Sequence, residues 1–565
     1  MIIRRPSEIE NDVTATAAGN LTIDQLLLNQ VRKGPHRPFV CDPPNKTEIT
    51  GSVPHQFSFR ELNMRVQALA HVLRNIGLRQ DDIVAVRLPN TSEAVIAMLA
   101  IWRAGMIACL LPLTWRRREW SRALEAVSPK AVITMTRIGE EDAALTASLM
   151  AENQFSIRFV AAFGPGSRDG IIALDSLIND AMASGDDIDD GDASVRPHAG
   201  DHVATITFME LAEGIVPVPR CHASWIALAM RPAADLALAP GKRLLNPFML
   251  SQLTSLSAGL LPCLLTGAMM ILHHPFDLFA LGAQFAAHRP TAMLVPAALT
   301  GDLADIEGSE SLRAILRIVP FGIAPPQRRE KAEGVVFDYA AFGEQALLPL
   351  VTGSDGHRGL RIGTYHVRDN GNGSPVVAEV RECTAPTAPG TFRTHEMIRF
   401  GKAATETANR HYLEIAGSMA PDGDWVETVK PTQTLGHRPR RAGINEIPVV
   451  FSKEAGNIYS ASGFVPGVGA IGGVAISLDA LDRTYGQIDG AESAVVASRD
   501  DGIAVGFVPK GTTPLDPEEV RGAIASLAIA EHKLAGWMTT LSAVPRTGTG
   551  DIDRASVGDK ASRRV

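Results

Sequence analysis

The stretch from Ala204 to Trp225 has the layout of a phosphate-binding loop but lacks the residues of one. A β-rich segment leads into a turn around Gly214, and the apolar run Trp225–Met230 follows. Strand, loop and helix in this order can direct backbone N–H groups and a helix end at an anion. Phosphate loops also need several glycines, small hydroxyl residues and a lysine. Here a single glycine remains, Glu210 and Glu213 carry the wrong charge, and there is no lysine.

Three other patterns that could carry chemistry have a simpler structural interpretation. Residues 467–472 satisfy Gly-x-Gly-x-x-Gly, but the next residues are typical of a strand rather than of the helix that a dinucleotide site requires. The pair His273-His274 has no further ligand at helical spacing, so we interpret it as structural and predict no metal site. The acidic run 186–192 lacks the oxygen ligands of a calcium loop at Ile188 and Pro197, which favours a solvated linker.

The composition limits the class of protein. The 565 residues are 45% hydrophobic and 21% charged, which indicates a multidomain globular protein with a large core. A formal net charge of −8 argues against a nucleic-acid partner. The five cysteines are scattered and lack Cys-x-x-Cys spacing, which favours reduced thiols in a cytoplasmic protein. No apolar run follows Arg4-Arg5, so we expect no signal peptide. Pro262 interrupts the most apolar stretch, Leu253–Leu272, which predicts a buried helix and strand rather than a membrane span.

Strands and helices alternate over the first part of the chain. Ser58-Phe59-Arg60-Glu61 is a capping box, and it opens a helix with one apolar face that stops at Gly77. Further strands are expected at Ile83–Leu88, Met106–Leu111 and Ala131–Thr134, and further helices at Ser92–Ala104 and Trp115–Val127. This alternation predicts a parallel, doubly wound α/β sheet.

The order of these motifs resembles the adenylate-forming superfamily, which includes acyl-CoA synthetases, luciferases and nonribosomal-peptide adenylation domains. The resemblance rests on Phe57–Leu62 and on Leu88-Pro89-Asn90 to Gly105, with Gly267-Ala268 and Thr291–Pro296 further along the chain. The resemblance implies a large N-terminal part, residues 1–462, with parallel α/β subdomains and a β-subdomain. It also implies a small mobile α+β lid at residues 463–565, which would turn about Gly467.

The resemblance also assigns the nucleotide site, and this chain departs from the pattern at its charged positions. The family's phosphate loop falls on Met209–Pro217, where only Gly214 matches. The Mg²⁺-binding glutamate position is Ala346, the ribose-binding aspartate position is Lys430, and the catalytic lysine position is Asp551. The remaining nucleotide-site positions are Gly322, Ala324, Phe342 and Gly343. An apolar acyl or aryl pocket would be lined by Phe248, Met249, Phe321, Ala340, Ala341 and Phe342.

These departures bear directly on function. Forming an acyl-adenylate brings two anions together, so catalysis depends on cations, a metal and backbone donors. Loss of one such donor costs roughly 3–4 kcal/mol of barrier. We therefore expect a non-adenylating pseudoenzyme with no catalytic residue, with weak or lost ATP, Mg²⁺ and CoA binding, that binds a small carboxylate or acyl ligand or a protein partner. Two alternatives stay open: an active ATP-dependent carboxylate–CoA ligase with a rebuilt site that uses Arg220 or Lys430, and a structural subunit without a ligand.

Overall fold

The computed structural model describes most of the chain. The described residues are 21–166, 168–183, 199–211, 214–275, 277–299, 306–320, 334–353, 358–367, 376–386, 397–400, 409–416, 445–447, 449–453, 458–464, 467–471, 474–499, 502–511, 515–546, 552–561 and 563–565. Six expected site residues fall outside them, namely Glu213, Phe321, Gly322, Ala324, Lys430 and Asp551.

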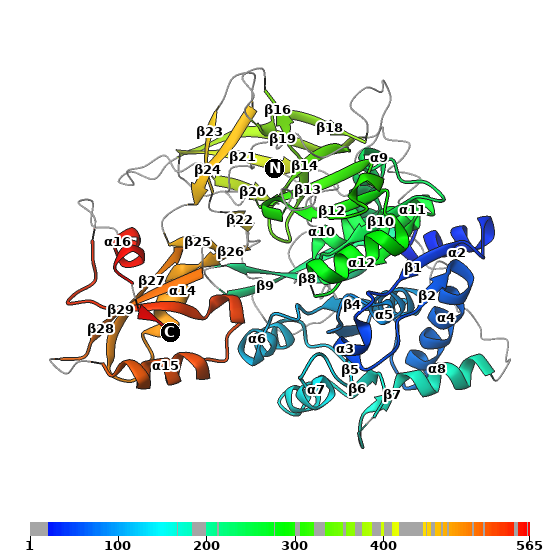
Figure 1. The fold of residues 1–565 in the computed structure, drawn as a ribbon, viewed down its shortest axis with the longest axis horizontal. Coiled ribbons are helices and arrows are strands. Elements are labelled where there is room, and N and C mark those ends of the chain that lie inside the picture. Colours follow the sequence, from blue (N-terminus) through cyan, green and yellow to red (C-terminus); the bar gives the residue numbers. More distant parts are fainter. Residues whose placement is uncertain are drawn as a thin grey trace.

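The first of two large sheets has the strand order β7-β6-β5-β3-β4-β8-β9 (Figure 1). It is parallel from β7 to β8, and β9 is antiparallel to β8. Its strands are β3 (Ile83–Val86), β4 (Ile107–Leu110), β5 (Ala131–Met135), β6 (Phe159–Phe163), β7 (Ile172–Ala173), β8 (Val203–Leu211) and β9 (Gly214–Cys221). The connecting helices are α5 (Ser92–Arg103), α6 (Arg117–Val127), α7 (Ala143–Glu152) and α8 (Leu174–Ala183). The parallel, doubly wound arrangement predicted from the sequence is confirmed.

The second large sheet has the order β15-β14-β13-β12-β10-β11-β1-β2. Its pairs are parallel except for β1–β2 and β14–β15 at the two edges. Its strands are β1 (Pro38–Cys41), β2 (Gln56–Ser58), β10 (Arg243–Asn246), β11 (Met269–Leu272), β12 (Ala292–Pro296), β13 (Ala314–Pro320), β14 (Val335–Ala341) and β15 (Leu347–Pro349). The associated helices are α2 (Ile23–Lys33), α3 (Lys46–Thr50), α4 (Phe59–Asn75), α9 (His222–Asp235), α10 (Leu253–Ser255), the π-helical turn η4 (Leu256–Leu260), α11 (Leu261–Thr266) and α12 (Leu278–His288).

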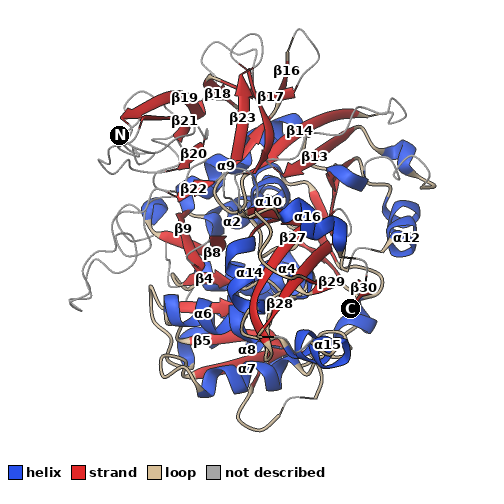
Figure 2. Cartoon of the chain, turned by 90° about the vertical axis from the view of Figure 1, so that its left-hand side faces the viewer, coloured by secondary structure: helices blue, strands red, loops and turns tan. Residues whose placement is uncertain are grey.

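The apolar residues form layers because strand side chains alternate between the two faces of a sheet. Val84 and Val86 of β3 join the central core, which also holds α4, α5 and α9 and the inner face of the second sheet. Ile83 and Ala85 face the other way and pack with α6 and α7. The outer face of the second sheet packs against α12. Helices therefore lie between the two sheets and on both outer sides, and Figure 2 shows strands and helices alternating through the molecule.

A β-rich part follows the second sheet. One sheet contains β16 (Val351–Thr352), β17 (Arg358–Arg361), β24 (Ile458–Phe464) and β23 (Val449–Lys453). The other contains β18 (Gly363–His366), β19 (Val376–Pro386), β21 (Asn409–Ala416), β20 (Met397–Phe400) and β22 (Asn445–Ile447). This agrees with the β-subdomain expected from the sequence. Strand β24 runs across the predicted domain boundary between residues 462 and 463.

The C-terminal residues form a separate mixed sheet with the order β27-β28-β29-β30 (Figure 1). Its strands are β27 (Ala491–Arg499), β28 (Gly502–Pro509), β29 (Ala535–Thr540) and β30 (Arg563–Arg564), and the hairpin β25 (Val468–Ile471) and β26 (Val474–Ser477) precedes it. Its helices are α14 (Leu478–Tyr485), α15 (Pro517–Ser526) and α16 (Arg554–Lys560). The sheet has an apolar core of its own, contributed by β27, β28, β29 and the two helices α14 and α15.

The short 3-10 turns are η3 (Ala199–Asp201), η5 (Ala297–Leu299), η7 (Ser309–Ser311) and η8 (Glu531–Lys533). Of the five cysteines, Cys41, Cys109, Cys221 and Cys263 are buried and form no disulfide, and the side chain of Cys383 is outside the described set. In the described part of the chain, no helix is long and apolar enough to cross a membrane.

Candidate functional site

The segment expected to be a phosphate loop is a tight hairpin. Strands β8 and β9 stay in antiparallel register up to the pair Leu211–Gly214, so only two residues separate the strands. The expected order of strand, loop and helix is corrected here, because β9 lies between the turn and α9. The helix α9 begins at His222, where the Cys221 sulfur caps the N–H of Ser224 at 3.4 Å. The proline-containing segment Ile215–Arg220 forms a strand because β8 supplies its pairing partner.

Arg220 is fully buried at the end of this hairpin. It is one of the two residues that could replace the loop lysine in the active-ligase alternative. Its Nη1 donates to the carbonyl oxygen of Glu344 at 2.9 Å, and its Nη2 donates to the carbonyl oxygen of Gln345. The guanidinium carbon also lies 5.4 Å from the centre of the Trp225 ring. Arg220 therefore ties β9 to the segment that follows β14.

Glu344 is a site residue to which sequence reasoning gave no role. Its Oε2 accepts a hydrogen bond from the N–H of Leu253 at 2.8 Å, at the start of α10. Burial of the carboxyl group raises its pKa to about 7, and the nearby Arg220 and Thr207 partly offset this rise. Its sequence signal is a glutamate two positions before Ala346, the position at which the superfamily has its Mg²⁺-binding glutamate.

Residues Phe342–Ala346 form a compact turn against β8. Phe342 N–H donates to the carbonyl of Ala346 at 2.9 Å, and Gln345 N–H donates to the carbonyl of Phe342 at 2.9 Å. Gly343 has a φ of +55°, and a Cβ placed there would lie 3.6 Å from the Met209 sulfur. The structure therefore brings two motifs of the expected nucleotide site together, and Phe342 and Ala346 are buried within the contact.

Gln345 is fully buried in the same turn. Neither its side-chain oxygen nor its side-chain nitrogen has a hydrogen-bond partner within the part of the chain that the structure describes. A buried amide without partners is costly, so a water molecule or a ligand would be favourable beside it.

The described members of the expected acyl pocket lie in two places. Phe248 and Met249 are half-buried in the loop after β10, where Asn246 Oδ1 accepts from the Phe248 N–H at 3.1 Å. Ala340 and Ala341 end β14, and Ala340 is fully buried. Gly467, the expected hinge, has a φ of +87° and packs against Asp479.

The histidine pair directly follows β11. His273 is fully buried, its Nδ1 lies 2.8 Å from Gln284 Oε1, and its Nε2 accepts from the Asp277 N–H at 3.1 Å. Burial lowers the pKa of His274 to about 4. Among the residues whose positions are described, no three His, Cys, Asp or Glu side chains form a group suited to a metal ion.

The C-terminal part docks on α6 through residues 528–533. Glu119 Oε1 accepts from the Ala530 N–H at 2.8 Å and from Lys533 Nζ at 3.1 Å. Arg118 N–H donates to the carbonyl of Ala528 at 3.1 Å, and Ala530 is buried in the apolar cluster that also holds Trp120. In Figure 1 the C-terminal part lies beside α6 and the β8–β9 hairpin.

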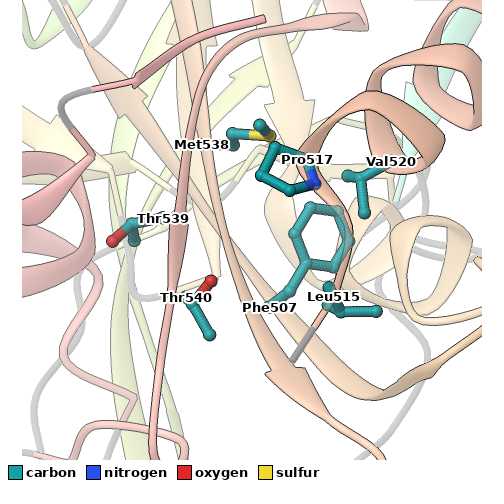
Figure 3. A pocket seen from close by; sticks show the side chains of 7 residues that line it. All are labelled: Phe507, Leu515, Pro517, Val520, Met538, Thr539 and Thr540. Atoms are coloured by element: carbon teal, nitrogen blue, oxygen red, sulfur yellow. The ribbon is translucent and has the colours of Figure 1, made fainter. Parts of the chain in front are cut away.

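One cavity of about 280 Å³ lies within the C-terminal part, between α15 and the strands β28 and β29. Figure 3 shows Phe507, Leu515, Pro517 and Val520 gathered together, with Thr539 and Thr540 set apart from them. None of the expected acyl-pocket residues lines this cavity.

Comparison with known proteins decides the family. Residues 28–208 match the family model for AMP-binding enzymes. This region, about a third of the chain, is thus similar to AMP-binding enzymes of the adenylate-forming superfamily. The expected recognition and fold class are therefore confirmed, while the loss of the catalytic motifs stays a prediction.

Two curated relatives from this superfamily illustrate the sequence similarity. The chain is 30% identical over 124 residues to 2-hydroxy-7-methoxy-5-methyl-1-naphthoate–CoA ligase of Streptomyces carzinostaticus. The matched segment covers 22% of each chain. The chain is also 29% identical over 258 residues to 3-[(3aS,4S,7aS)-7a-methyl-1,5-dioxo-octahydro-1H-inden-4-yl]propanoyl:CoA ligase of Mycobacterium tuberculosis. This second match covers 44% of the chain and 48% of the relative. The matched segments thus span less than half the length of both relatives.

Solved structures extend the similarity of fold to almost the whole chain. Amide bond synthetase McbA from Marinactinospora thermotolerans superposes with a TM-score of 0.67 at 15% identity, over 95% of this chain and 99% of its own. The o-succinylbenzoate CoA synthetase from Bacillus subtilis superposes with a TM-score of 0.66 at 15% identity, over 95% and 98% of the two chains. At this identity the likeness shows the fold alone.

Proposed function

We propose that this acyl-CoA synthetase-like protein is a pseudoenzyme that forms no acyl-adenylate and binds an acyl or aryl carboxylate, or a protein partner. The observation that carries the proposal is the arrangement of Arg220 and Glu344. Arg220 is the buried cation at the end of the β8–β9 hairpin, and the protein's own carbonyl groups already hold it. A nucleotide phosphate would have to displace those contacts.

The electrostatics around this arrangement also oppose a bound triphosphate. The carboxyl of Glu344 already occupies the N–H of Leu253, which is a donor that an anion could use. The side chain of Ala346 has no oxygen with which to hold Mg²⁺, and the residue is fully buried. Strands β8 and β9 pair as far as Leu211 and Gly214, so the described residues of this segment form a ladder and not an anion-binding loop.

The active-ligase alternative is supported by the names of the curated relatives, two of which are CoA ligases. It would use Arg220 or Lys430 as the substitute cation, and Lys430 lies outside the described residues. The proposed domains are a large part up to the end of β24 and a C-terminal lid hinged near Gly467. The proposed location is the cytoplasm.

Isothermal titration calorimetry with MgATP tests the proposal. We expect little heat and no thermal stabilisation of the protein at millimolar MgATP. An active superfamily ligase titrated in parallel is the positive control. A dissociation constant in the micromolar range would overturn the pseudoenzyme proposal and favour the rebuilt ligase.

A further inference from the structure

A second cleft lies at the start of β14, away from the nucleotide-site positions. It has a volume of about 310 Å³ and lies between α9, β14 and the strands β16, β17 and β18. Its walls are partly apolar, including Phe337 and Leu350, and they also carry three arginines. Strand β14 runs from this cleft at Val336 to Ala341, next to the turn that holds Glu344. The cleft and the turn therefore lie at opposite ends of one strand.

The charges in and behind this cleft do not balance. Asp338 is buried and accepts from two arginines at once, with Arg317 Nε on Oδ1 and Arg358 Nη1 on Oδ2. Arg317 is also buried, and its Nη2 has no hydrogen-bond partner within the described residues. A single carboxylate thus serves two guanidinium groups and leaves one positive charge unmatched.

The pair of Asp235 with Arg231 is neutral as a whole, so it does not offset this excess. Asp235 accepts from Arg231 Nε at 2.9 Å and from the Tyr339 hydroxyl at 2.5 Å. Arg361 contributes a further guanidinium from an exposed position. The Tyr365 hydroxyl fixes the backbone there, because it donates to the Arg361 carbonyl at 3.0 Å and accepts from the Arg361 N–H at 2.9 Å. Four arginines against two aspartates leave a net charge of +2 among these residues.

We propose that this cleft binds a small organic oxyanion, a carboxylate or phosphate ester with an apolar body. Arginines give carboxylates and phosphates charge-assisted, often bidentate hydrogen bonds, and a guanidinium is more weakly hydrated than an ammonium group. The apolar walls would contact the body of the ligand. The volume lies at the lower end of the range of roughly 300–1,000 Å³ for small-molecule pockets, which limits the ligand to a compact molecule.

Calorimetry with four probes on the full chain tests this proposal. Benzoate and phenyl phosphate carry the anion and an apolar ring, inorganic phosphate carries only the anion, and phenol carries only the ring. We expect saturable binding of benzoate or phenyl phosphate, and which of the two binds more tightly identifies the headgroup. Inorganic phosphate and phenol should bind at least about tenfold more weakly, because phosphate lacks the apolar ring and phenol lacks the anionic group.

Two variants locate the site. Arg361→Gln should lower the affinity for the probe about 10- to 100-fold, because one charge-assisted contact is lost. Arg32→Gln, the same change on the exposed face of α2, is the matched control and should leave binding unchanged. Thr352→Trp keeps every charge, fills the cleft and should also weaken binding. Thermal unfolding of each variant verifies that it is folded.

Three outcomes would overturn the proposal. The first is that the wild-type protein shows no saturable binding of either aromatic anion at millimolar concentration. Phenol could bind as tightly as benzoate, which would make the cleft a plain apolar pocket. Equal binding by the wild type, Arg361→Gln and Thr352→Trp would place the bound anion elsewhere on the molecule.

Discussion

Two residues at the β8–β9 hairpin, Arg220 and Glu344, carry the proposal that the protein forms no acyl-adenylate. Arg220 is a buried cation that donates hydrogen bonds to backbone carbonyls, and Glu344 is a partly buried acid beside it. A buried charge needs partners, and here the partners belong to the turn after β14. The site thus has the character of a structural contact, which can be tested by substitution.

Replacing Arg220 with lysine should destabilise the protein. A lysine keeps the charge but cannot donate to two neighbouring carbonyls in the fixed geometry of a guanidinium. We expect a loss of about 1–3 kcal/mol in the free energy of unfolding, measured by urea denaturation. The exposed Arg289→Lys is the control and should change stability by less than about 0.5 kcal/mol. An unchanged free energy of unfolding for Arg220→Lys would show that the hydrogen bonds of the Arg220 guanidinium do not stabilise the protein.

Glu344 should make stability depend on pH. Burial raises its pKa from 4.5 to about 7, so the folded state holds the proton more tightly than the unfolded chain does. Its contribution is therefore fully present below about pH 4.5 and is lost as the pH rises through about 7. The expected loss is about 1–2 kcal/mol, since the residue keeps some contact with solvent.

Glu344→Gln should remove this part of the pH dependence. Urea denaturation at pH 5 and pH 7.5 would show a smaller difference for the variant than for the wild type. The exposed Glu140→Gln should keep the wild-type difference. Identical pH profiles for wild type and Glu344→Gln would contradict a raised pKa at this position.

At the scale of elements, α6 and the segment 528–533 form the main described anchor of the C-terminal part. Glu119 and Lys533 are an ion pair whose side chains are 5% and 9% exposed, whereas Arg116 and Glu531 are 38% and 77% exposed. The two pairs lie on the same interface, so they give a matched comparison. Burial strengthens a charge–charge contact and makes its loss costly, while exposed pairs contribute little.

A double-mutant cycle on Glu119 and Lys533 should give a coupling energy of about 1–3 kcal/mol. Lys533→Met alone should also cost stability, because it leaves the Glu119 carboxylate buried without its cation. The corresponding cycle on Arg116 and Glu531 should give less than about 1 kcal/mol. Small-angle scattering of Lys533→Met would report whether the C-terminal part leaves α6. Equal coupling energies for the two pairs would mean that burial does not strengthen this anchor.

At the scale of the whole molecule, the sequence predicts the layered α/β fold well and the site less well. The capping box at Ser58, helix α4 and the alternation that follows are local patterns, and the structure confirms them. Strand β9 was missed because two prolines and one arginine make it a weak strand by propensity, and its pairing with β8 decides the outcome. Glu344 was missed because its pKa and partners depend on α10 and β9, which are distant in sequence.

Replacing Asp551 with lysine, the residue that the superfamily resemblance puts there, should not restore adenylation. The substitution supplies one cation, but the side chain of Ala346 would still offer no oxygen to Mg²⁺, and the described residues of β8 and β9 would still pair as a hairpin. Contributions within one site are not additive, so a single replacement cannot be expected to regain a fixed share of the rate.

Pyrophosphate exchange into ATP, measured across a panel of aliphatic and aromatic carboxylic acids, tests the central claim most directly. The wild type and Asp551→Lys are assayed beside an active superfamily ligase, which shows that the assay works. We predict no exchange above background for either form of this protein with any acid. Robust acid-dependent exchange by the wild type would show an active ligase, and exchange by Asp551→Lys alone would show an otherwise intact site.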